Sequence, residues 1–369
     1  MSLLTDECIA MWPDRRFLDL VGIELPIVQA PMAGAMDAEL AAAVSAAGGL
    51  GSLPCAMLGP AQIRQEVERI RAQTAKPINL NFFCHVAPAL NNAREASWRE
   101  RLAPYYRDLA IDPTAPVPTS NRAPFDDALC EVVLELRPKV VSFVFGLPAA
   151  ALLERVKRED FVVVGSATTV QEARWLAAHG VDAVIAQGVE AGGHRGMFLT
   201  DDTAAQVGAL ALVPQIVDAV DVPVIAAGGI TDARGIAAAF ALGAAAVQMG
   251  TAFLHCPEAK ISQPHRAALQ SAQADGTALT NLMTGRPARG FINRVMREIG
   301  PINAVAPEFP LAAGALAPLR QKAEAMGCGD FSPMWSGQAA ALGRALPAGE
   351  LTRKLATEAL ERMQKLAAP

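Results

Sequence analysis

Eight short segments rich in Val, Ile, Leu and Ala recur along the chain, and they constrain its fold more than any other feature. Each is a continuous apolar run rather than an alternation of apolar and polar residues, which is typical of parallel strands buried on both faces. Between most of them lies a helical stretch with one apolar side, for example residues 37–47, 60–73, 169–179 and 232–242. The eight predicted strands begin at Ile27, Leu50, Ile78, Val140, Val162, Ala183, Val222 and Ala246.

The spacing of these segments selects one kind of α/β fold. Most successive strands begin 21 to 28 residues apart, which is the length of one βα unit, whereas two gaps are longer, at 62 and 39 residues. Eight such units close into a TIM (β/α)8 barrel of about 250 residues. An open, doubly wound sheet would have fewer units and a GxGxxG turn near the start, and no GxGxxG follows a predicted strand here. We therefore predict a (β/α)8 barrel over residues 1–254.

The 369 residues exceed what one barrel needs. The longest gap, about residues 84–137, includes the loop-like sequence DPTAPVPTSNRAP and is interpreted as an insertion of helices and loop after the third strand. After residue 254 the strand repeat stops, and residues 264–274 and 351–366 have helical patterns. We expect residues 255–369 to form a smaller, mainly helical second domain that packs over the barrel mouth.

Composition excludes several classes of protein. With 52% hydrophobic and 19% charged residues the chain can build a large core, which argues against intrinsic disorder. Its net charge of −5 argues against a nucleic-acid partner. The apolar stretch at residues 40–58 is interrupted by glycines and a proline, so no membrane span is predicted, and the N-terminus lacks the pattern of a signal peptide. The six cysteines are far apart with no CxxC pair, which favours reduced thiols in a cytoplasmic protein without a metal site.

Two glycine-containing turns follow the last two predicted strands of the barrel. Active sites of such barrels form at the carboxyl ends of the strands, and a phosphate site commonly follows strands seven and eight. Glycines allow the backbone to approach a ligand closely, and N–H groups at a helix start favour an anion. The alternative is that these glycines only permit tight packing of helix on strand. The candidate phosphate-binding residues are Gly228, Gly229, Gln248, Met249, Gly250 and Thr251.

A histidine lies in the glycine-rich loop VEAGGHRG, directly after the sixth predicted strand. Because an imidazole titrates near neutral pH, His194 is the candidate general base. The alternative is a structural or merely exposed loop residue, and His85, after the third strand, is a weaker competitor. Further on, the segment 285–300 contains Arg286, Arg289, Arg294 and Arg297, which we interpret as a solvated helical face or, alternatively, as an anion contact.

The ordered motifs from residue 27 to residue 289 resemble those of the nitronate monooxygenases, formerly called 2-nitropropane dioxygenases. The motifs are IVQAPMAG, SAAGGLGSL, INLNFF, QGVEAGGHRG, VIAAGGI, VQMGTAFL and TGRPARG. The resemblance implies a TIM barrel that holds non-covalent FMN, with the phosphate on the two glycine turns. It assigns His194 as the catalytic base. The residues it places against the rest of the flavin are Pro31, Met32, Asn81, Gln187 and Gly192.

The activity implied is oxidation of alkyl nitronates, and also of neutral nitroalkanes, by O2 to a carbonyl compound and nitrite. The sequence departs from the family pattern at Val144, where many close members have a second histidine, so we expect a more apolar pocket. The alternative function is an NAD(P)H-dependent FMN reductase of the same barrel type, acting on an enoyl thioester or a quinone. A non-catalytic flavin- or phosphate-binding barrel is the third hypothesis. The oligomeric state stays open, a homodimer being one arrangement.

Overall fold

The computed structural model describes residues 12–114, 116–271 and 276–368. Its central element is a parallel sheet of eight strands, and each predicted apolar segment contains one of them. Most of the side chains in these strands are buried, as expected for strands covered on both faces. The strands are β1 (Ile27–Gln29), β2 (Gly51–Pro54), β3 (Ile78–Phe83), β4 (Val140–Val144), β5 (Val162–Ala167), β6 (Ala183–Gln187), β8 (Val224–Ala227) and β9 (Ala246–Met249).

The sheet closes on itself. Its order is β1-β9-β8-β6-β5-β4-β3-β2, and every neighbouring pair is parallel. A parallel bridge between Val28 and Leu50 joins the two end strands, with Gln29 N–H donating to the Leu50 carbonyl at 2.9 Å. The predicted TIM barrel is therefore confirmed. Because all eight strands run in the same direction, their carboxyl ends meet around one mouth.

A ring of helices surrounds the sheet. Several begin at a side-chain cap that accepts from a backbone N–H in the first turn: Asp37 caps α3, Thr169 caps α8 and Asp232 caps α10. The helices that follow successive strands are α3 (Ala38–Ala46), α4 (Pro60–Arg71), α6 (Asp127–Leu136), α7 (Ala150–Lys157), α8 (Val170–Ala178), α9 (Ala209–Val217) and α10 (Ala233–Ala241). The short helix α2 (Arg16–Val21) precedes β1 and buries Phe17 and Leu18 in the same core.

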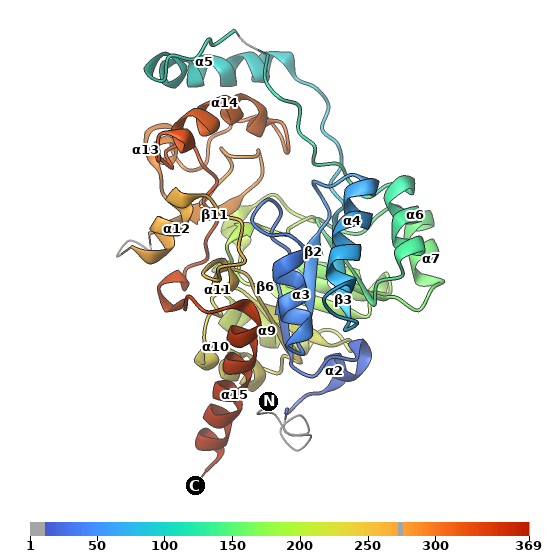
Figure 1. The fold of residues 1–369 in the computed structure, drawn as a ribbon. Coiled ribbons are helices and arrows are strands. Elements are labelled where there is room, and N and C mark those ends of the chain that lie inside the picture. Colours follow the sequence, from blue (N-terminus) through green and yellow to red (C-terminus); the bar gives the residue numbers. More distant parts are fainter. Residues whose placement is uncertain (1–11, 115, 272–275, 369) are drawn as a thin grey trace.

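The eighth position of the ring is taken by the last helix of the chain, α15 (Ala348–Ala367). It packs against both α10 and α3, and Leu351 and Leu355 are buried in the barrel core. Figure 1 shows α15 beside α10. The division of the chain at residue 254 stays a prediction, but the packing assigns this helix to the barrel. The residues between β9 and α15 thus form one long excursion from the barrel mouth.

A second excursion leaves the barrel after β3. Its helix α5 (Asn92–Asp108) packs against α14 (Ala312–Ala325), and Figure 1 shows these two helices at the end of the molecule opposite α2 and α15. Trp98 is fully buried there, and its indole N–H donates to the Ala312 carbonyl at 3.1 Å. Within the expected insertion at 84–137, α6 instead packs between α4 and α7 as a regular barrel helix. The two excursions therefore share a second hydrophobic core.

The region after residue 254 also contains strands, although only helices are predicted there from the sequence. Strands β10 (Thr277–Thr280) and β11 (Ala288–Phe291) pair antiparallel, and β11 also pairs with β7 (Gly193–His194). The remaining helical elements are α11 (Thr251–Leu254), α12 (Gln263–Gln270), α13 (Arg294–Ile299) and the 3-10 turns η1 (Thr203–Ala205) and η2 (Ala340–Leu342). In the described part of the chain, no helix is long and apolar enough to cross a membrane.

Candidate active site

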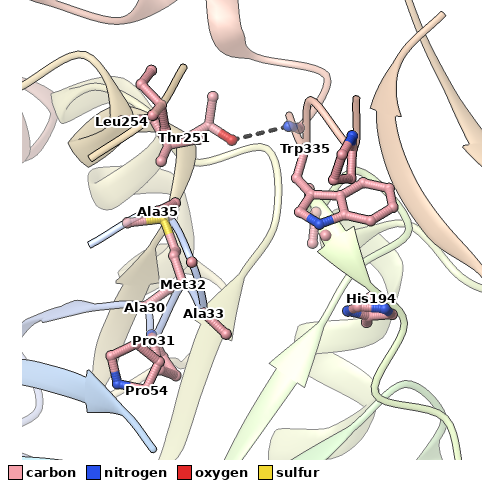
Figure 2. A pocket seen from close by; sticks show the side chains of 18 of the residues that line it. Ala30, Pro31, Met32, Ala33, Ala35, Pro54, His194, Thr251, Leu254 and Trp335 are labelled. Atoms are coloured by element: carbon pink, nitrogen blue, oxygen red, sulfur yellow. Dashed lines mark hydrogen bonds between the residues drawn. The ribbon is translucent and has the colours of Figure 1, made fainter. Parts of the chain in front are cut away.

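A cavity of about 440 Å³ lies at the carboxyl ends of the strands. Its walls come from the barrel loops and from the excursion after β9, which contributes Trp335 and Gly337. Figure 2 shows Pro31, Met32 and Pro54 along one side and His194 with Trp335 along the other. The predicted site residues that line this cavity are Pro31, Met32, Asn81, Gln187, Gly192, His194, Gly228, Gly229, Gln248, Gly250 and Thr251.

Met249 is the predicted site residue that the cavity excludes. Its side chain is buried in the barrel core, and its carbonyl accepts a hydrogen bond from the Ala30 N–H at 2.9 Å. The reason is the alternation of strand β9, in which Gln248 points toward the cavity and its neighbour points away. Met249 therefore supports the barrel and does not contact a ligand with its side chain.

The loop that carries His194 is held from both sides. The Gln187 amide donates to the His194 carbonyl at 3.0 Å and accepts from the Gly196 N–H at 2.7 Å. The fully buried Arg195 donates to the carbonyls of Gln187 at 2.7 Å and Gly188 at 2.6 Å. Burial lowers the pKa of Arg195 to about 10, so it remains cationic at neutral pH. A loop fixed in this way presents the histidine with little conformational freedom.

The imidazole of His194 lies among aromatic rings and one hydroxyl. Its Nε2 is 2.9 Å from Oγ1 of Thr284, and the rings of Phe309 and Trp335 have centroids 5.3 Å and 5.5 Å from it. The ring of Phe145 lies 6.0 Å away, and the backbone at this residue has φ +70°, which is rare for a non-glycine residue. Strained backbone of this kind is concentrated at functional sites.

The charge environment keeps His194 neutral. Burial is the largest cause of its lowered pKa, and together with the charges of Arg122 and Arg286 it brings the pKa to about 3. The imidazole is therefore uncharged at neutral pH, and its surroundings favour an anion. With its proton on Nε2, the ring donates to Thr284 and leaves a lone pair on Nδ1. With its proton on Nδ1, it offers an N–H donor instead.

The glycine turns have the geometry of an anion site. Gly228 and Gly229 have φ of +102° and +72°, and a Cβ on Gly228 would lie 3.0 Å from both the Ala191 nitrogen and the Gly188 oxygen. Within the described ranges, no acceptor faces the N–H groups of Gly228, Gly229 and Gly250. Unpaired backbone donors beside a cavity suit a phosphate or another anion.

Two further polar side chains, Gln248 and Asn81, also line the cavity. The Oε1 atom of Gln248 is buried and has no partner among the residues described, so it is available to a ligand donor. The amide of Asn81 donates to the Ser142 hydroxyl at 2.9 Å, which fixes its orientation. The residues present therefore fit a flat, partly polar ligand with an anionic end.

His85 does not line the cavity. It is buried, and its ring packs edge-on against Phe309 at a centroid distance of 4.8 Å. Burial, followed by the charge of Arg286, lowers its pKa to about 4. Of the two candidate histidines, His194 is therefore the one that a ligand in the cavity can reach.

The arginine-rich segment 285–300 is only partly the helical face that was expected. Arg289 lies on strand β11, is buried, and donates to the Val189 carbonyl at 3.0 Å. Arg286 lies over the Phe145 ring, with its guanidinium carbon 4.1 Å from the centroid. Arg294 is on helix α13 and forms ion pairs with acidic neighbours. The helical interpretation is therefore wrong for the first two of these arginines.

Several residues in or beside the cavity gave no signal in the sequence. Thr284 is the first residue of the motif TGRPARG, and Trp335 lies in FSPMWSGQAA, yet neither motif indicates a chemical role by itself. Arg122 is in the loop-like stretch after β3. Among the described residues, no three His, Cys, Asp or Glu side chains are grouped as a metal ion would require.

The sequence and structural relatives agree with one another. The family model described as nitronate monooxygenase matches residues 14–358. A nitronate monooxygenase from Pseudomonas aeruginosa is 43% identical over 345 residues, which cover 93% of this chain and 98% of that protein. A nitronate monooxygenase from Paraburkholderia phytofirmans is 42% identical over 357 residues, which cover 95% of this chain and 97% of that protein.

Solved structures extend the comparison to three dimensions. A nitroalkane oxidase from Streptomyces ansochromogenes has a TM-score of 0.87 and 40% identity, and the match covers 95% of this chain and all of that one. FabK from Thermotoga maritima has a TM-score of 0.72 and 31% identity over 95% of this chain and 97% of its own. The family match spans the eight-stranded barrel, the His194 loop and the whole excursion between β9 and α15. On this evidence the chain belongs to the nitronate monooxygenase family.

Proposed function

We propose that the protein oxidises alkyl nitronates with O2, using FMN, and that His194 acts directly on the substrate. The single observation that carries this proposal is the position of His194 in the cavity wall opposite Pro31 and Met32, with the unpaired glycine N–H groups in the same cavity. Family membership supports the reaction class. The products would be a carbonyl compound and nitrite.

The cavity suits FMN because its two ends differ in chemistry. Gly228, Gly229, Gly250 and Thr251 would hold the phosphate through backbone donors, and the Oε1 atom of Gln248 would accept from a ring N–H. When bound, FMN supplies the one-electron chemistry between the substrate and O2 that amino-acid side chains lack. The protein contributes binding, orientation and an enclosed pocket.

His194 has two available roles, and its environment distinguishes them. The lone pair of a neutral imidazole can remove the α-proton of a nitroalkane. A pKa lowered to about 3 makes this imidazole a weak base, so the proton transfer receives little driving force. A substrate that arrives as the nitronate anion needs no proton removal and can accept a hydrogen bond from the ring. The site therefore favours nitronates over neutral nitroalkanes.

The wall behind His194 restricts water. The rings of Phe83, Phe145, Phe309 and Trp335 all lie within 6.4 Å of the imidazole centroid. Such an apolar wall strengthens each remaining polar contact to the substrate, because less water competes with it. It also accommodates the alkyl part of a nitronate.

The test measures nitrite release under air from purified, FMN-loaded protein. Ethyl nitronate and neutral nitroethane are compared in the wild type, in His194→Asn and in the control His179→Asn, which alters an exposed histidine on the outer surface. We expect the wild type to prefer the nitronate and the His194 variant to lose at least about tenfold in kcat/KM. Unchanged turnover of nitroethane by His194→Asn would remove this residue as a base.

The same preparation tests the two alternatives. Rapid bleaching of the flavin by NADH without O2, together with no nitrite from nitronates, would favour the NAD(P)H-dependent reductase. A yellow protein inert toward nitronates, NADH and quinones would favour a non-catalytic flavin-binding barrel. A colourless protein that does not take up FMN would contradict the cofactor assignment itself.

A further inference from the structure

Among the described residues that line the cavity, Arg122 has a guanidinium without an ion-pair partner. Arg122 lies on the extended segment between α5 and α6 and lines the same cavity as His194. Within the part of the chain that the structure describes, no carboxylate lies within 4.0 Å of its guanidinium and no acceptor receives its side-chain N–H groups. The other cavity-lining cations differ: Lys260 pairs with Glu39 at 2.5 Å and Arg320 with Glu324 at 2.9 Å.

The segment around Arg122 is anchored to the barrel mouth. The Asn121 side chain donates to the Met57 carbonyl at 3.0 Å, and the Phe125 N–H donates to the Phe83 carbonyl at 2.7 Å. These contacts hold the segment against the carboxyl ends of β2 and β3. The guanidinium therefore has a defined place in the cavity rather than a free position in solvent.

Leaving this cation without a partner is unfavourable for the free protein. Burial lowers the pKa of Arg122, and repulsion from Arg320 adds to that effect. Its charge also reaches His194, because it contributes to the lowered pKa of the imidazole. A cation of this kind is stabilised when an anion enters the cavity.

The anion is not expected to be the cofactor phosphate. In the closed strand order, β3 and β8 are separated by four steps in either direction, so they lie on opposite sides of the barrel. The glycine turn with the free N–H groups follows β8, whereas the Arg122 segment is anchored beside β3. The charge of Arg122 is therefore placed on the side of the cavity where His194 and Phe83 meet.

We infer that Arg122 binds a planar, two-oxygen anionic group of the substrate and thereby selects anionic substrates. This inference rests on the proposed function. A guanidinium presents parallel N–H donors that match a group of this shape. A nitronate group has this planar, two-oxygen shape, and so does a carboxylate at the far end of a nitronate substrate. Arg122 could therefore bind either group by the same pair of hydrogen bonds.

The experiment compares Arg122→Gln and Arg122→Lys with wild type, each loaded with FMN. The control Arg107→Gln removes the same charge from an exposed position on α5, in the same excursion. KM and kcat are measured for ethyl nitronate and for the nitronate of 3-nitropropionate, and propionate binding is measured by calorimetry. Thermal unfolding and flavin content verify that each variant is folded and loaded.

We expect Arg122→Gln to raise KM by about 10- to 100-fold with a smaller change in kcat, and Arg122→Lys to recover part of the loss. An increase for both nitronates means that the guanidinium contacts the nitronate group. An increase only for the carboxylated substrate, with weaker propionate binding, means that it contacts the second anion. Unchanged KM values and unchanged propionate binding would overturn the inference. If wild type turned over neither nitronate, the proposed function would fail, and propionate binding alone would then decide the role of Arg122.

Discussion

The imidazole of His194 and the hydroxyl of Thr284 are 2.9 Å apart, although 90 positions separate them in the sequence. The histidine belongs to the loop after β6, and the threonine belongs to the excursion between β9 and α15. The same two segments pair as strands, with His194 opposite Ala288. The excursion therefore completes the candidate active site rather than merely covering it.

Loss of this hydroxyl should reduce activity more than stability. We expect Thr284→Val to lower kcat/KM for ethyl nitronate about tenfold, because the imidazole loses the partner that fixes its orientation. The free energy of unfolding should fall by only about 1 kcal/mol. Thr284→Ser keeps the hydroxyl and should retain most of the activity. Equal kinetics in Thr284→Val and wild type would show that Thr284 does not position His194.

The glycine turn after β8 should be needed to retain FMN. In Gly228→Ala the new Cβ meets the Ala191 nitrogen and the Gly188 oxygen at 3.0 Å, at a residue with φ +102°. We expect the Kd for FMN, measured by flavin fluorescence, to rise at least about tenfold. Gly327→Ala is the control, since its φ is +74° but nothing lies within 4 Å of the added Cβ. That variant should lose about 1–2 kcal/mol of stability and keep its flavin. Comparable flavin loss in both variants would assign the effect to backbone strain alone.

The half-buried His194 should make the protein less stable in acid. The pKa of His194 is lowered to about 3 in the folded state, while an unfolded histidine titrates near 6.5. Between these values the unfolded chain binds a proton that the folded chain does not, so the free energy of unfolding falls as pH falls below 6.5. Above that pH this histidine contributes no pH dependence.

Urea unfolding of wild type and His194→Gln isolates this contribution from that of the other titrating groups. From about pH 6 to about pH 4, the wild type should lose about 1.4 kcal/mol per pH unit more than the variant. At about pH 7.5 the two curves should run parallel. Parallel curves at every pH would contradict a lowered pKa of the imidazole at this position.

Val144 should control the polarity of the pocket. It ends strand β4 in the cavity wall and packs against a cluster that includes Phe83, Phe145 and Phe309. We expect Val144→His to lower the free energy of unfolding by about 1–3 kcal/mol, since an imidazole there has few polar partners. It should also raise KM for longer alkyl nitronates relative to short ones. Val144→Leu, which remains apolar, is the control, and an equal change in both variants would mean that size rather than polarity matters.

The second hydrophobic core should depend on Trp98. This side chain is fully buried between the two excursions and donates to the Ala312 carbonyl. Trp98→Ala should lower the free energy of unfolding by about 3–5 kcal/mol. The milder Tyr106→Phe removes only the hydroxyl that donates to the Ala315 carbonyl at 2.6 Å, and it should lose about 1 kcal/mol. If Trp98→Ala unfolds like wild type, the excursions do not depend on this contact.

The barrel could be predicted from the sequence because its signals are local. Each strand is a continuous apolar run such as that at Val140, and each helix repeats its apolar positions along a single face, so periodicity alone reveals both. The carboxyl ends of parallel strands must meet at one mouth. That rule predicts His194, Gly228 and Gln248 in one cavity, and all three line it. Only the alternation within β9 separated Met249 from its neighbours.

What tertiary structure alone decided lies in the two excursions. The pairing of β7 with β11, the hydroxyl of Thr284 and the ring of Trp335 reach His194 across long separations in sequence, and no local pattern encodes such contacts. The position of α15 is also set by tertiary structure. Its apolar face could pack against several helices, and in the fold it packs against α10 and α3. Local chemistry thus determines the elements, whereas packing of distant segments determines which side chains share a cavity, because burial rewards contacts regardless of their distance along the chain.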